Sequence, residues 1–181
     1  MRTLQQGGEF KVIIKKARSS KKLKPEKLAQ VLGKKSEPRQ TDLTLTALPS
    51  IRFFDGRGAN RPWLCEIPDP LSRIAWQTPV IIHPDTAKQK GITQQDIIQI
   101  QSETGTLEAP VYLSEVVSPL AMVMAIGQGH SSYGRYARNT GLNPVTLLSA
   151  KTDRDSGVCS LALDNVSIEK TGRTLQLAHT D

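Results

Sequence analysis

Hydrophobic and polar residues alternate with short periods along most of the chain, which predicts strands rather than long helices. Residues 43–48, LTLTAL, follow a period of two, which is typical of a strand with one buried face. Strands are also predicted at 80–83, 96–102, 106–113, 120–126, 158–163 and 166–168. Pro110 lies inside one of these runs and indicates a bulge or an edge position there.

The predicted helices are short and carry proline at or near their start. Residues 25–32 place Leu28, Val31 and Leu32 along one stripe. Residues 84–90 and 143–148 are predicted to form one or two helical turns each. The prolines on either side of Asp69 predict an extended, non-helical course. Six or more short strands with brief helices predict a mainly β fold, a closed or nearly closed barrel, because closure removes exposed strand edges.

Charge is unevenly distributed along the chain. Residues 1–46 contain 12 Lys/Arg and 4 Asp/Glu, whereas residues 47–181 contain 12 Lys/Arg and 13 Asp/Glu, so the net charge of +7 comes from the leader. We therefore divide the chain into a basic, partly disordered N-terminal extension at 1–42, a barrel at 43–172 and a flexible tail at 173–181. The leader is typical of a solvated arm, with docking to an acidic partner or anionic lipid as the alternative. Nucleic-acid binding is the least favoured alternative, because the folded part is nearly neutral.

Residue counts exclude several kinds of site. The two cysteines, Cys65 and Cys159, cannot by themselves supply the roughly four clustered ligands of an iron–sulfur or structural zinc site. The three histidines, His83, His130 and His179, are too scattered to indicate a metal site. No run approaches the ~20 apolar residues of a membrane span. The N-terminus lacks the apolar region of a signal peptide, so we expect the chain to stay where it is made unless a partner carries it.

The segment 120–148 begins as a buried strand and continues as a loop that is dense in glycine and polar donors. Glycines such as Gly127 and Gly129 permit a positive φ and let a ligand approach the main chain closely. The amide, imidazole and guanidinium groups of the loop supply hydrogen-bond donors in several geometries. This pattern indicates a loop that holds a large polar ligand, and a surface loop with turn glycines is the alternative.

An ordered set of motifs extends over about ninety residues. It comprises PWLCEIPDP at 62–70, Trp76, VIIHPDTAKQKGI at 80–92, DIIQIQSETGTLEAPVY at 96–112 and the stretch that ends in NPVTLL. Asp96, just before a predicted strand, is expected to cap a turn. Residues 61–148 resemble the C-terminal molybdopterin-dinucleotide-binding domain of the molybdopterin oxidoreductase superfamily. The form GQGHxxYGRYA is most similar to the large iron–sulfur subunit of alternative complex III.

The resemblance implies a double-psi β barrel with a few short helices, and molybdopterin guanine dinucleotide as the cofactor. It implies main-chain contacts to anions around the loop glycines, an arginine fork on the pyrophosphate, and side-chain hydrogen bonds to pterin or purine edges. The implied cofactor-binding residues are Gly127, Gln128, Gly129, His130, Arg135, Arg138 and Asn143. The alternatives are a loop histidine bonded to the main chain at 130, solvated arginines at 135 and 138, and an asparagine at 143 that only starts a turn.

The resemblance also implies a role in a membrane-associated respiratory complex. There this module is not catalytic alone: it caps a pterin or former pterin site while electrons move through clusters on an iron–sulfur partner. The membrane is reached only through the complex, and the chain faces the periplasm if a partner carries it. The alternative is a ligand-free structural or assembly subunit of a quinol-oxidising complex, in which the cofactor has been lost and the basic leader docks onto a partner.

Overall fold

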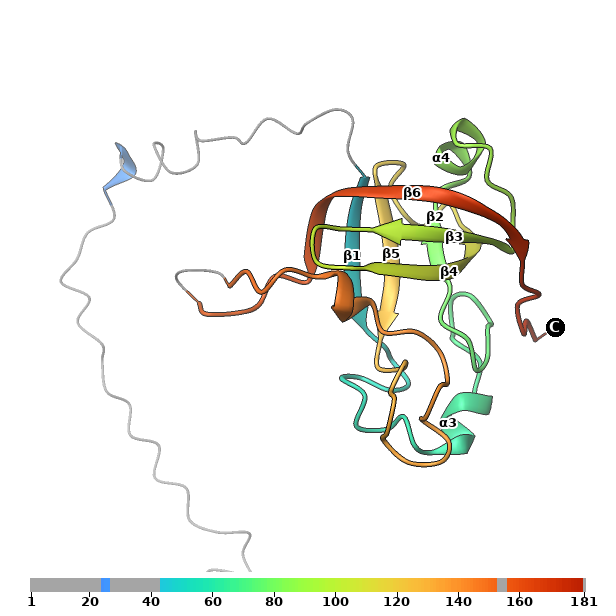
Figure 1. Ribbon diagram of the computed structural model, residues 1–181. Helices are drawn as coiled ribbons and strands as arrows, with labels where there is room; N and C mark the ends of the chain where they lie inside the picture. The colour runs from blue at the N-terminus through green and yellow to red at the C-terminus, as the bar shows by residue number, and fades with distance from the viewer. Residues whose placement is uncertain (1–23, 27–42, 153–155, 181) are drawn as a thin grey trace, which may run out of the picture. The chain divides into compact units, whose positions relative to one another are not determined.

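Six strands form a closed barrel (Figure 1). The computed structural model describes residues 24–26, 43–152 and 156–180, and the barrel lies in a compact unit that comprises Gln40–Asp181. The strands are β1 (Leu43–Pro49), β2 (Val80–Ile82), β3 (Asp96–Gln101), β4 (Thr106–Leu113), β5 (Ala121–Ile126) and β6 (Ala162–Thr174). Two short helices, α3 (Pro62–Glu66) and α4 (Pro84–Gln89), and a 3-10 helix, η1 (Pro144–Leu147), connect them. The mainly β barrel that the hydrophobic pattern predicts is confirmed.

The barrel mixes parallel and antiparallel pairs in the order β1-β5-β2-β4-β3-β6. β1 is parallel to β5, and β2 is parallel to β4. The pairs β2/β5, β3/β4 and β3/β6 are antiparallel. β6 also runs antiparallel to β1, and this pair closes the barrel. The arrangement agrees with the double-psi barrel that the resemblance implies.

The core follows directly from the alternation along the strands. In β1 every second residue, Leu43, Leu45 and Ala47, is buried, and the residues between them are partly exposed. Because successive side chains of a strand point to opposite faces, this pattern places one face of each strand inside the barrel. The remaining fully buried core side chains of the strands are Val80, Ile82, Ile98, Ile100, Ala109, Val111, Met122 and Met124.

Asp96 begins β3 and is 2% exposed. Its Oδ2 atom accepts hydrogen bonds from the main-chain nitrogen of Thr93 (2.6 Å) and from the Thr93 hydroxyl (2.8 Å), and it lies 2.8 Å from Nζ of Lys170. Burial is the largest single influence and opposes ionisation, but Lys170 and Thr93 together lower the pKa of Asp96 below its usual value. The predicted turn cap is therefore confirmed, and it also ties the turn to β6.

The structure differs from the predicted elements in two places. Residues 62–66 form α3, because Pro62 occupies the first helical turn, where its missing N–H costs nothing. The two strands expected at 158–163 and 166–168 are instead one strand, β6, preceded by an isolated bridge between Thr152 and Cys159. β6 remains continuous because it pairs with β1 through its first half and with β3 through its second half.

The C-terminal segment that we expected to be a flexible tail is hydrogen-bonded up to Thr180. β6 itself extends to Thr174, and His179 forms an isolated bridge with Ile74. The main-chain nitrogen of Ala75 donates to the carbonyl of residue 178 over 2.9 Å, and Leu177 is 5% exposed. The segment therefore lies along residues 73–77, a contact that composition alone does not reveal.

Some predictions fall largely outside the described residues. The basic extension at 1–42 lies almost entirely outside them. Of the helix expected at 25–32, only Pro25 and Glu26 are described, and both are helical. Among the described residues, no helix has the length and apolar character needed to span a membrane.

Candidate functional site

Two loops lie side by side at one end of the barrel, below it in Figure 1. Loop 50–61 follows β1, and loop 127–143 follows β5. Because β1 and β5 are parallel neighbours, with Pro49 opposite Ile126, their following loops leave the sheet at the same edge. A small buried cluster of Phe53, Ala59, Cys65 and Ala137 packs beneath both loops. The strand pairing thus brings together two loops that are about eighty residues apart in sequence.

Gly129 makes the closest main-chain approach within loop 127–143. Its φ is +80°, and a Cβ atom there would lie 2.3 Å from the main-chain nitrogen of Asn143. Its own N–H donates to the carbonyl of Thr140 over 2.8 Å. No larger residue fits this position without displacing the main chain. Gly129 therefore closes the base of the loop, and its N–H is engaged inside the protein.

Gln128 is buried beneath the loop and is 6% exposed. Its Oε1 accepts a hydrogen bond from the Thr78 hydroxyl (2.8 Å), and its Nε2 donates to the carbonyl of Trp76 (3.1 Å). The Thr78 hydroxyl also accepts from the main-chain nitrogen of Leu142 over 3.1 Å. Gln128 and Thr78 thus join the base of loop 127–143 to the chain just before β2, and both ends of the Gln128 amide have a partner within the protein.

Asn143 caps η1, because its Oδ1 accepts a hydrogen bond from the main-chain nitrogen of Val145 over 3.1 Å. His130 is partly buried, and its ring packs against the ring of Tyr133 at a centroid distance of 5.0 Å. The Nε2 atom of His130 is shielded from solvent and has no hydrogen-bond partner among the described residues. It faces Gly56, where a Cβ atom would lie 2.9 Å from it. The His130 side chain thus packs loop 127–143 against loop 50–61.

Arg135 and Arg138 both project from the loop as exposed side chains. The guanidinium of Arg135 lies over the ring of Tyr136, 5.5 Å from its centroid. Neither arginine forms an ion pair within the part of the chain that the structure describes. Both are accordingly available to an anionic ligand, in contrast to the buried Gln128.

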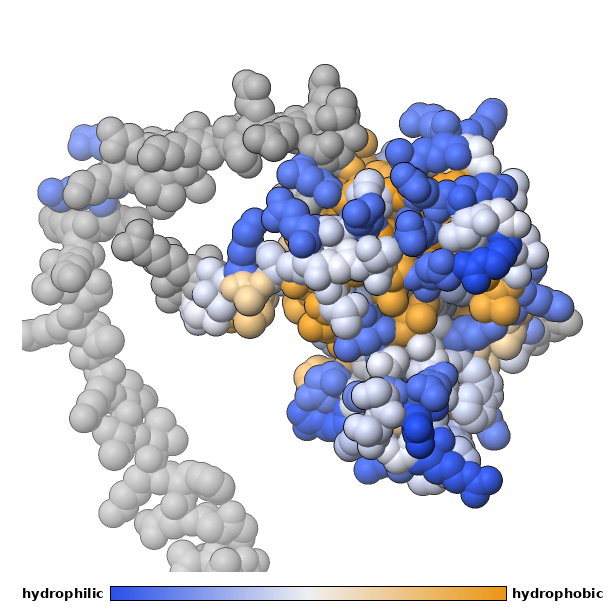
Figure 2. All heavy atoms as spheres, in the orientation of Figure 1, coloured by the Kyte–Doolittle hydropathy of each residue, from blue (hydrophilic) through white to orange (hydrophobic). Residues whose placement is uncertain are grey.

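A hollow of about 510 Å³ opens between the tips of the two loops. Its lining residues are Arg57, Asn60, Arg61, Ser132, Tyr133 and Gly134. Figure 2 shows that the end of the barrel carrying these loops is mostly hydrophilic on the face in view. None of these six residues is among the seven predicted cofactor-binding residues: three come from loop 50–61 and three from the tip of loop 127–143. The signal was present in the run DGRGANR, which places two arginines and an asparagine around a glycine turn.

Hydrogen-bond donors dominate this hollow. Arg57 is held by Asp55 through two contacts, from Nε to Oδ1 (2.9 Å) and from Nη2 to Oδ2 (2.7 Å). These contacts lower the pKa of Asp55 to about 2, the side-chain hydrogen bond from Arg57 being the largest cause. Arg61 has no such carboxylate partner among the described residues. Oδ1 of Asn60 accepts a hydrogen bond from the main-chain nitrogen of Tyr136 (2.9 Å). The arrangement favours a ligand with several anionic oxygens.

A family model described as the molydopterin dinucleotide binding domain matches residues 68–163, more than half of the chain. The chain belongs to this family. The family match thus confirms the resemblance to the molybdopterin-dinucleotide-binding domain that the sequence motifs indicated.

Relatives of this molybdopterin-binding chain include two reductase subunits. The molybdopterin-containing subunit of the arsenate respiratory reductase of Shewanella sp. (strain ANA-3) is 34% identical over 110 residues, covering 57% of this chain and 13% of that protein. The molybdopterin-containing subunit of the thiosulfate reductase of Salmonella typhimurium is 27% identical over 132 residues, covering 72% of this chain and 17% of that protein. This chain thus corresponds to less than one fifth of either relative's length.

Two further comparisons concern a subunit and a solved structure. The molybdopterin-binding-like subunit of the menaquinone reductase of Nitratidesulfovibrio vulgaris is 26% identical over 91 residues, covering 50% of this chain and 13% of that protein. The structure of the acetylene hydratase of Pelobacter acetylenicus superposes with a TM-score of 0.55 at 17% identity, covering 71% of this chain and 18% of that chain. At this identity the structural likeness establishes the fold alone, and it supports the double-psi-like barrel.

Arg52 and Cys65 hold loop 50–61 and the α3 segment together in this family member. Arg52 donates through Nη1 to the carbonyl of Ile67 over 2.7 Å, and its guanidinium lies 4.9 Å from the centroid of the Phe53 ring. Burial lowers the pKa of Arg52, and the nearby Asp69 opposes that shift. Cys65 is buried, and burial raises the pKa of its thiol. Arg52 and Cys65 thus support the site without facing the hollow.

The three histidines lie in separate parts of the structure and have different contacts. His83 caps α4 by accepting a hydrogen bond from Asp85 over 3.1 Å, His130 packs between the loops, and His179 lies in the C-terminal segment. Within the described residues no three His, Cys, Asp or Glu side chains gather in an arrangement that could hold a metal ion.

Proposed function

We propose that this chain is a cofactor-binding module of a molybdopterin oxidoreductase and is not catalytic alone. It holds the dinucleotide of the cofactor with the two loops at one end of the barrel, while the remainder of the enzyme carries the iron–sulfur clusters. The observation that carries this proposal is the hollow between the loops, in which donors predominate and Arg61 has no carboxylate partner among the residues that the structure describes. Family membership supports the same ligand.

The residues present fit the diphosphate of molybdopterin guanine dinucleotide. Arg61, Ser132 and the amide of Asn60 would hold the pyrophosphate oxygens, because charged and neutral donors converge on one hollow. Arg135 and Arg138 would supply further charge from the exposed side of loop 127–143. When bound, the cofactor supplies the redox-active metal through its pterin. The contribution of this chain is to bind and orient the dinucleotide and to exclude water from it.

We further propose that the parent complex is a membrane-associated respiratory assembly similar to alternative complex III, in which an iron–sulfur large subunit is the partner. Support comes from the form GQGHxxYGRYA at 127–137 and from the relative named as a menaquinone reductase subunit. The membrane is reached through the partner, which carries the module to the periplasmic face. The exposed arginines of the loop would then face the body of the partner.

Calorimetric titration of the full chain with GDP tests the binding proposal, because GDP carries the pyrophosphate and the base. We expect saturable binding that is weakened at least about tenfold by Arg61→Gln, since a charge-assisted hydrogen bond is worth about 1.5–3 kcal/mol. Arg135→Ala should weaken binding as well. Arg73→Gln, an exposed arginine outside the hollow, is the matched control and should leave the affinity unchanged. A flat titration, or equal effects of Arg61→Gln and Arg73→Gln, would rule out this site.

One observation favours a second function, that of a ligand-free assembly subunit. Gln128 is buried with both ends of its amide hydrogen-bonded inside the protein, and Oδ1 of Asn143 caps η1, so these predicted base-reading groups already have partners in the chain itself. In this version the barrel and the basic leader of residues 1–42 dock onto a redox partner. A complex that forms normally with a chain lacking residues 1–40, and that releases GDP-type nucleotide on denaturation, would contradict it.

A further inference from the structure

Of the described residues that line the hollow between the loop tips, Tyr133 is the aromatic one. The residue is 48% exposed, and the ring of His130 packs against its ring at a centroid distance of 5.0 Å, with 37° between the two planes. His130 is partly buried and supports the ring of Tyr133, while about half of Tyr133 stays open to solvent. An open aromatic ring beside hydrogen-bond donors is a surface on which a planar ligand can stack.

Tyr133 is held in place from both loops. Its hydroxyl donates to the carbonyl of Arg57 in loop 50–61 over 3.3 Å. The next residue, Gly134, has a φ of +93°, and a Cβ atom there would lie 2.3 Å from Nδ2 of Asn60, so the two loop tips approach each other closely at this point. A ring that is already fixed loses little conformational entropy when a ligand stacks on it.

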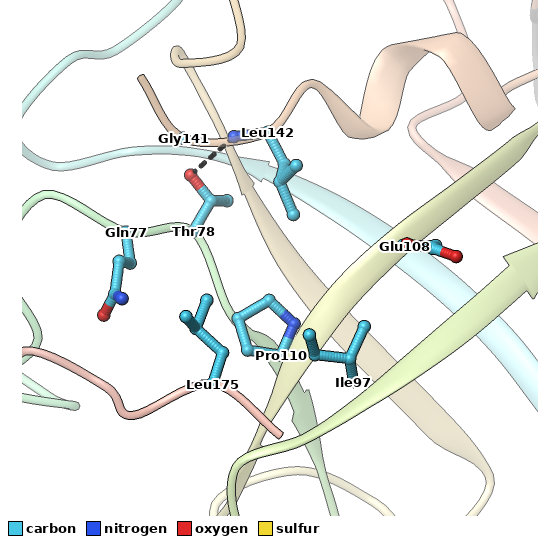
Figure 3. A pocket seen from close by; sticks show the side chains of 8 residues that line it. All are labelled: Gln77, Thr78, Ile97, Glu108, Pro110, Gly141, Leu142 and Leu175. Atoms are coloured by element: carbon cyan, nitrogen blue, oxygen red, sulfur yellow. Dashed lines mark hydrogen bonds between the residues drawn. The ribbon is translucent and has the colours of Figure 1, made fainter. Parts of the chain in front are cut away.

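The polar groups expected to contact the edge of a base are engaged within the chain. The amide of Gln128 is hydrogen-bonded to the Thr78 hydroxyl and to the carbonyl of Trp76. The Thr78 hydroxyl also accepts from the nitrogen of Leu142, the contact drawn as a dashed line in Figure 3. Oδ1 of Asn143 caps η1, and the donors that line the hollow are those assigned above to the diphosphate. This leaves the face of a base, rather than its edge, for the chain to recognise.

A second cavity, of about 230 Å³, offers no comparable surface (Figure 3). Its apolar walls include Pro110 and Leu175, and none of the described residues that line it is aromatic or cationic. The hollow of about 510 Å³ combines a ring with a cation, Arg61, and lies within the range of roughly 300–1,000 Å³ typical of small-molecule sites. A nucleoside diphosphate, with a flat base and an anionic diphosphate, fits this combination.

We propose that Tyr133 stacks on the nucleotide base of the cofactor, and that this chain does not distinguish guanine from adenine. Arg61 holds the diphosphate in the same hollow. Every base has a π-face, so stacking adds affinity without contact to the hydrogen-bonding edge. The inference rests on the proposed function, because it takes the hollow as the site of the dinucleotide, and it adds the residue that contacts the base.

Calorimetric titration of the full chain with GDP, ADP and methyl diphosphate tests the proposal, because methyl diphosphate carries the diphosphate ester without a base. We expect GDP and ADP to bind within about threefold of each other and about tenfold or more tighter than methyl diphosphate, since stacking of one base on an aromatic side chain supplies such a factor.

Two variants of Tyr133 and one control locate the effect. Tyr133→Leu should weaken both nucleotides about tenfold and leave methyl diphosphate unchanged, whereas Tyr133→Phe keeps the ring and should retain most of the nucleotide affinity. Trp63→Leu is the matched control, because Trp63 is a 58% exposed aromatic residue of α3 that does not line the hollow. That change should alter the binding of none of the three probes.

Three outcomes would overturn the inference and leave the proposed function in place. GDP and methyl diphosphate bind equally, GDP binds more than about tenfold tighter than ADP, which indicates hydrogen bonds to the base edge, or Tyr133→Leu weakens all three probes equally, which assigns the ring to holding the loops. Failure of the proposed function gives a different result. If no probe binds, or if Arg61→Gln leaves methyl diphosphate binding unchanged, the diphosphate site is absent and the base contact is lost with it.

Discussion

Replacement of Thr78 by valine is expected to lower the free energy of unfolding by about 2–4 kcal/mol, because one hydroxyl serves two partners beneath the site. The hydroxyl donates to Oε1 of Gln128 over 2.8 Å and accepts from the main-chain nitrogen of Leu142 over 3.1 Å. Thr78 and Gln128 are 3% and 6% exposed, so water cannot easily replace the lost partner. Valine preserves the branched shape and removes both hydrogen bonds.

The magnitude follows from the groups left behind. A buried polar group without a partner costs about 1–3 kcal/mol. Oε1 of Gln128 is buried and should contribute most of this cost, whereas Leu142 is only partly buried and should contribute less. The sum, about 2–4 kcal/mol, is a large fraction of the stability of a typical domain. We also expect weaker GDP binding, because the base of loop 127–143 is no longer fixed.

Urea unfolding of the full chain, followed by circular dichroism and by tryptophan fluorescence, measures the effect. Thr146→Val is the matched control, because the Thr146 hydroxyl is exposed and donates to the carbonyl of Asn143 over 2.9 Å. That change should cost about 0.5 kcal/mol or less. A Thr78→Val protein that is as stable as Thr146→Val would refute the reasoning that these buried contacts hold the loop base.

Three further predictions concern other parts of the barrel. Gly129→Ala should destabilise the protein by at least about 3 kcal/mol, because it combines a positive φ with a steric clash, whereas Gly157→Ala, with φ +71° and no atom within 4 Å of the added Cβ, should cost about 1–2 kcal/mol. Asp96→Asn should lower stability at pH 7 and flatten its acid dependence. The pKa of Asp96 is lowered on folding, so its contribution is complete above the unfolded value of about 3.9 and is lost as the pH falls through the lower folded pKa. Leu177→Ala should cost about 2–3 kcal/mol in urea unfolding, because the side chain is 5% exposed.

Each of these predictions has a clear negative outcome. Equal losses for the two glycine variants would show that backbone strain alone, and no close contact, limits position 129. If the stability of Asp96→Asn falls with decreasing pH as steeply as that of the unmodified protein, the ion pair between Asp96 and Lys170 does not contribute to the acid dependence. Leu175→Ala, at a 42% exposed position, is the control for Leu177, and equal costs would show that the C-terminal segment does not pack as described.

The strands could be predicted from the sequence because their alternation is a local property. Residues 43–48 carry the period of two by themselves, and the same holds for the strand that begins at Asp96. Helix α3 is hard to predict from the local pattern, because the prolines after residue 67 favour an extended chain whereas Pro62, at the first helical turn, favours a helix. The length of β6 depends on two different partner strands, and a local pattern cannot supply that information.

The candidate site was predictable only in part, because its contacts are long-range. The segment 127–143 is recognisable from its glycines and arginines, but nothing in it shows that Gln128 is bonded to a threonine fifty residues earlier. Likewise, Asn60 meets the main chain of Tyr136 across seventy-six residues. The hollow between the loops exists because β1 and β5 are parallel neighbours, which only the topology reveals.

The position of β6 has a consequence for synthesis of the chain. β6 is the last strand of the described barrel, and it joins β1, made first, to β3. Until residue 174 has left the ribosome, β1 and β3 each present an unpaired strand edge to the surrounding solution. Translation must therefore proceed past residue 174 before this barrel can close, and a nascent chain stalled earlier is exposed to aggregation and dependent on chaperones.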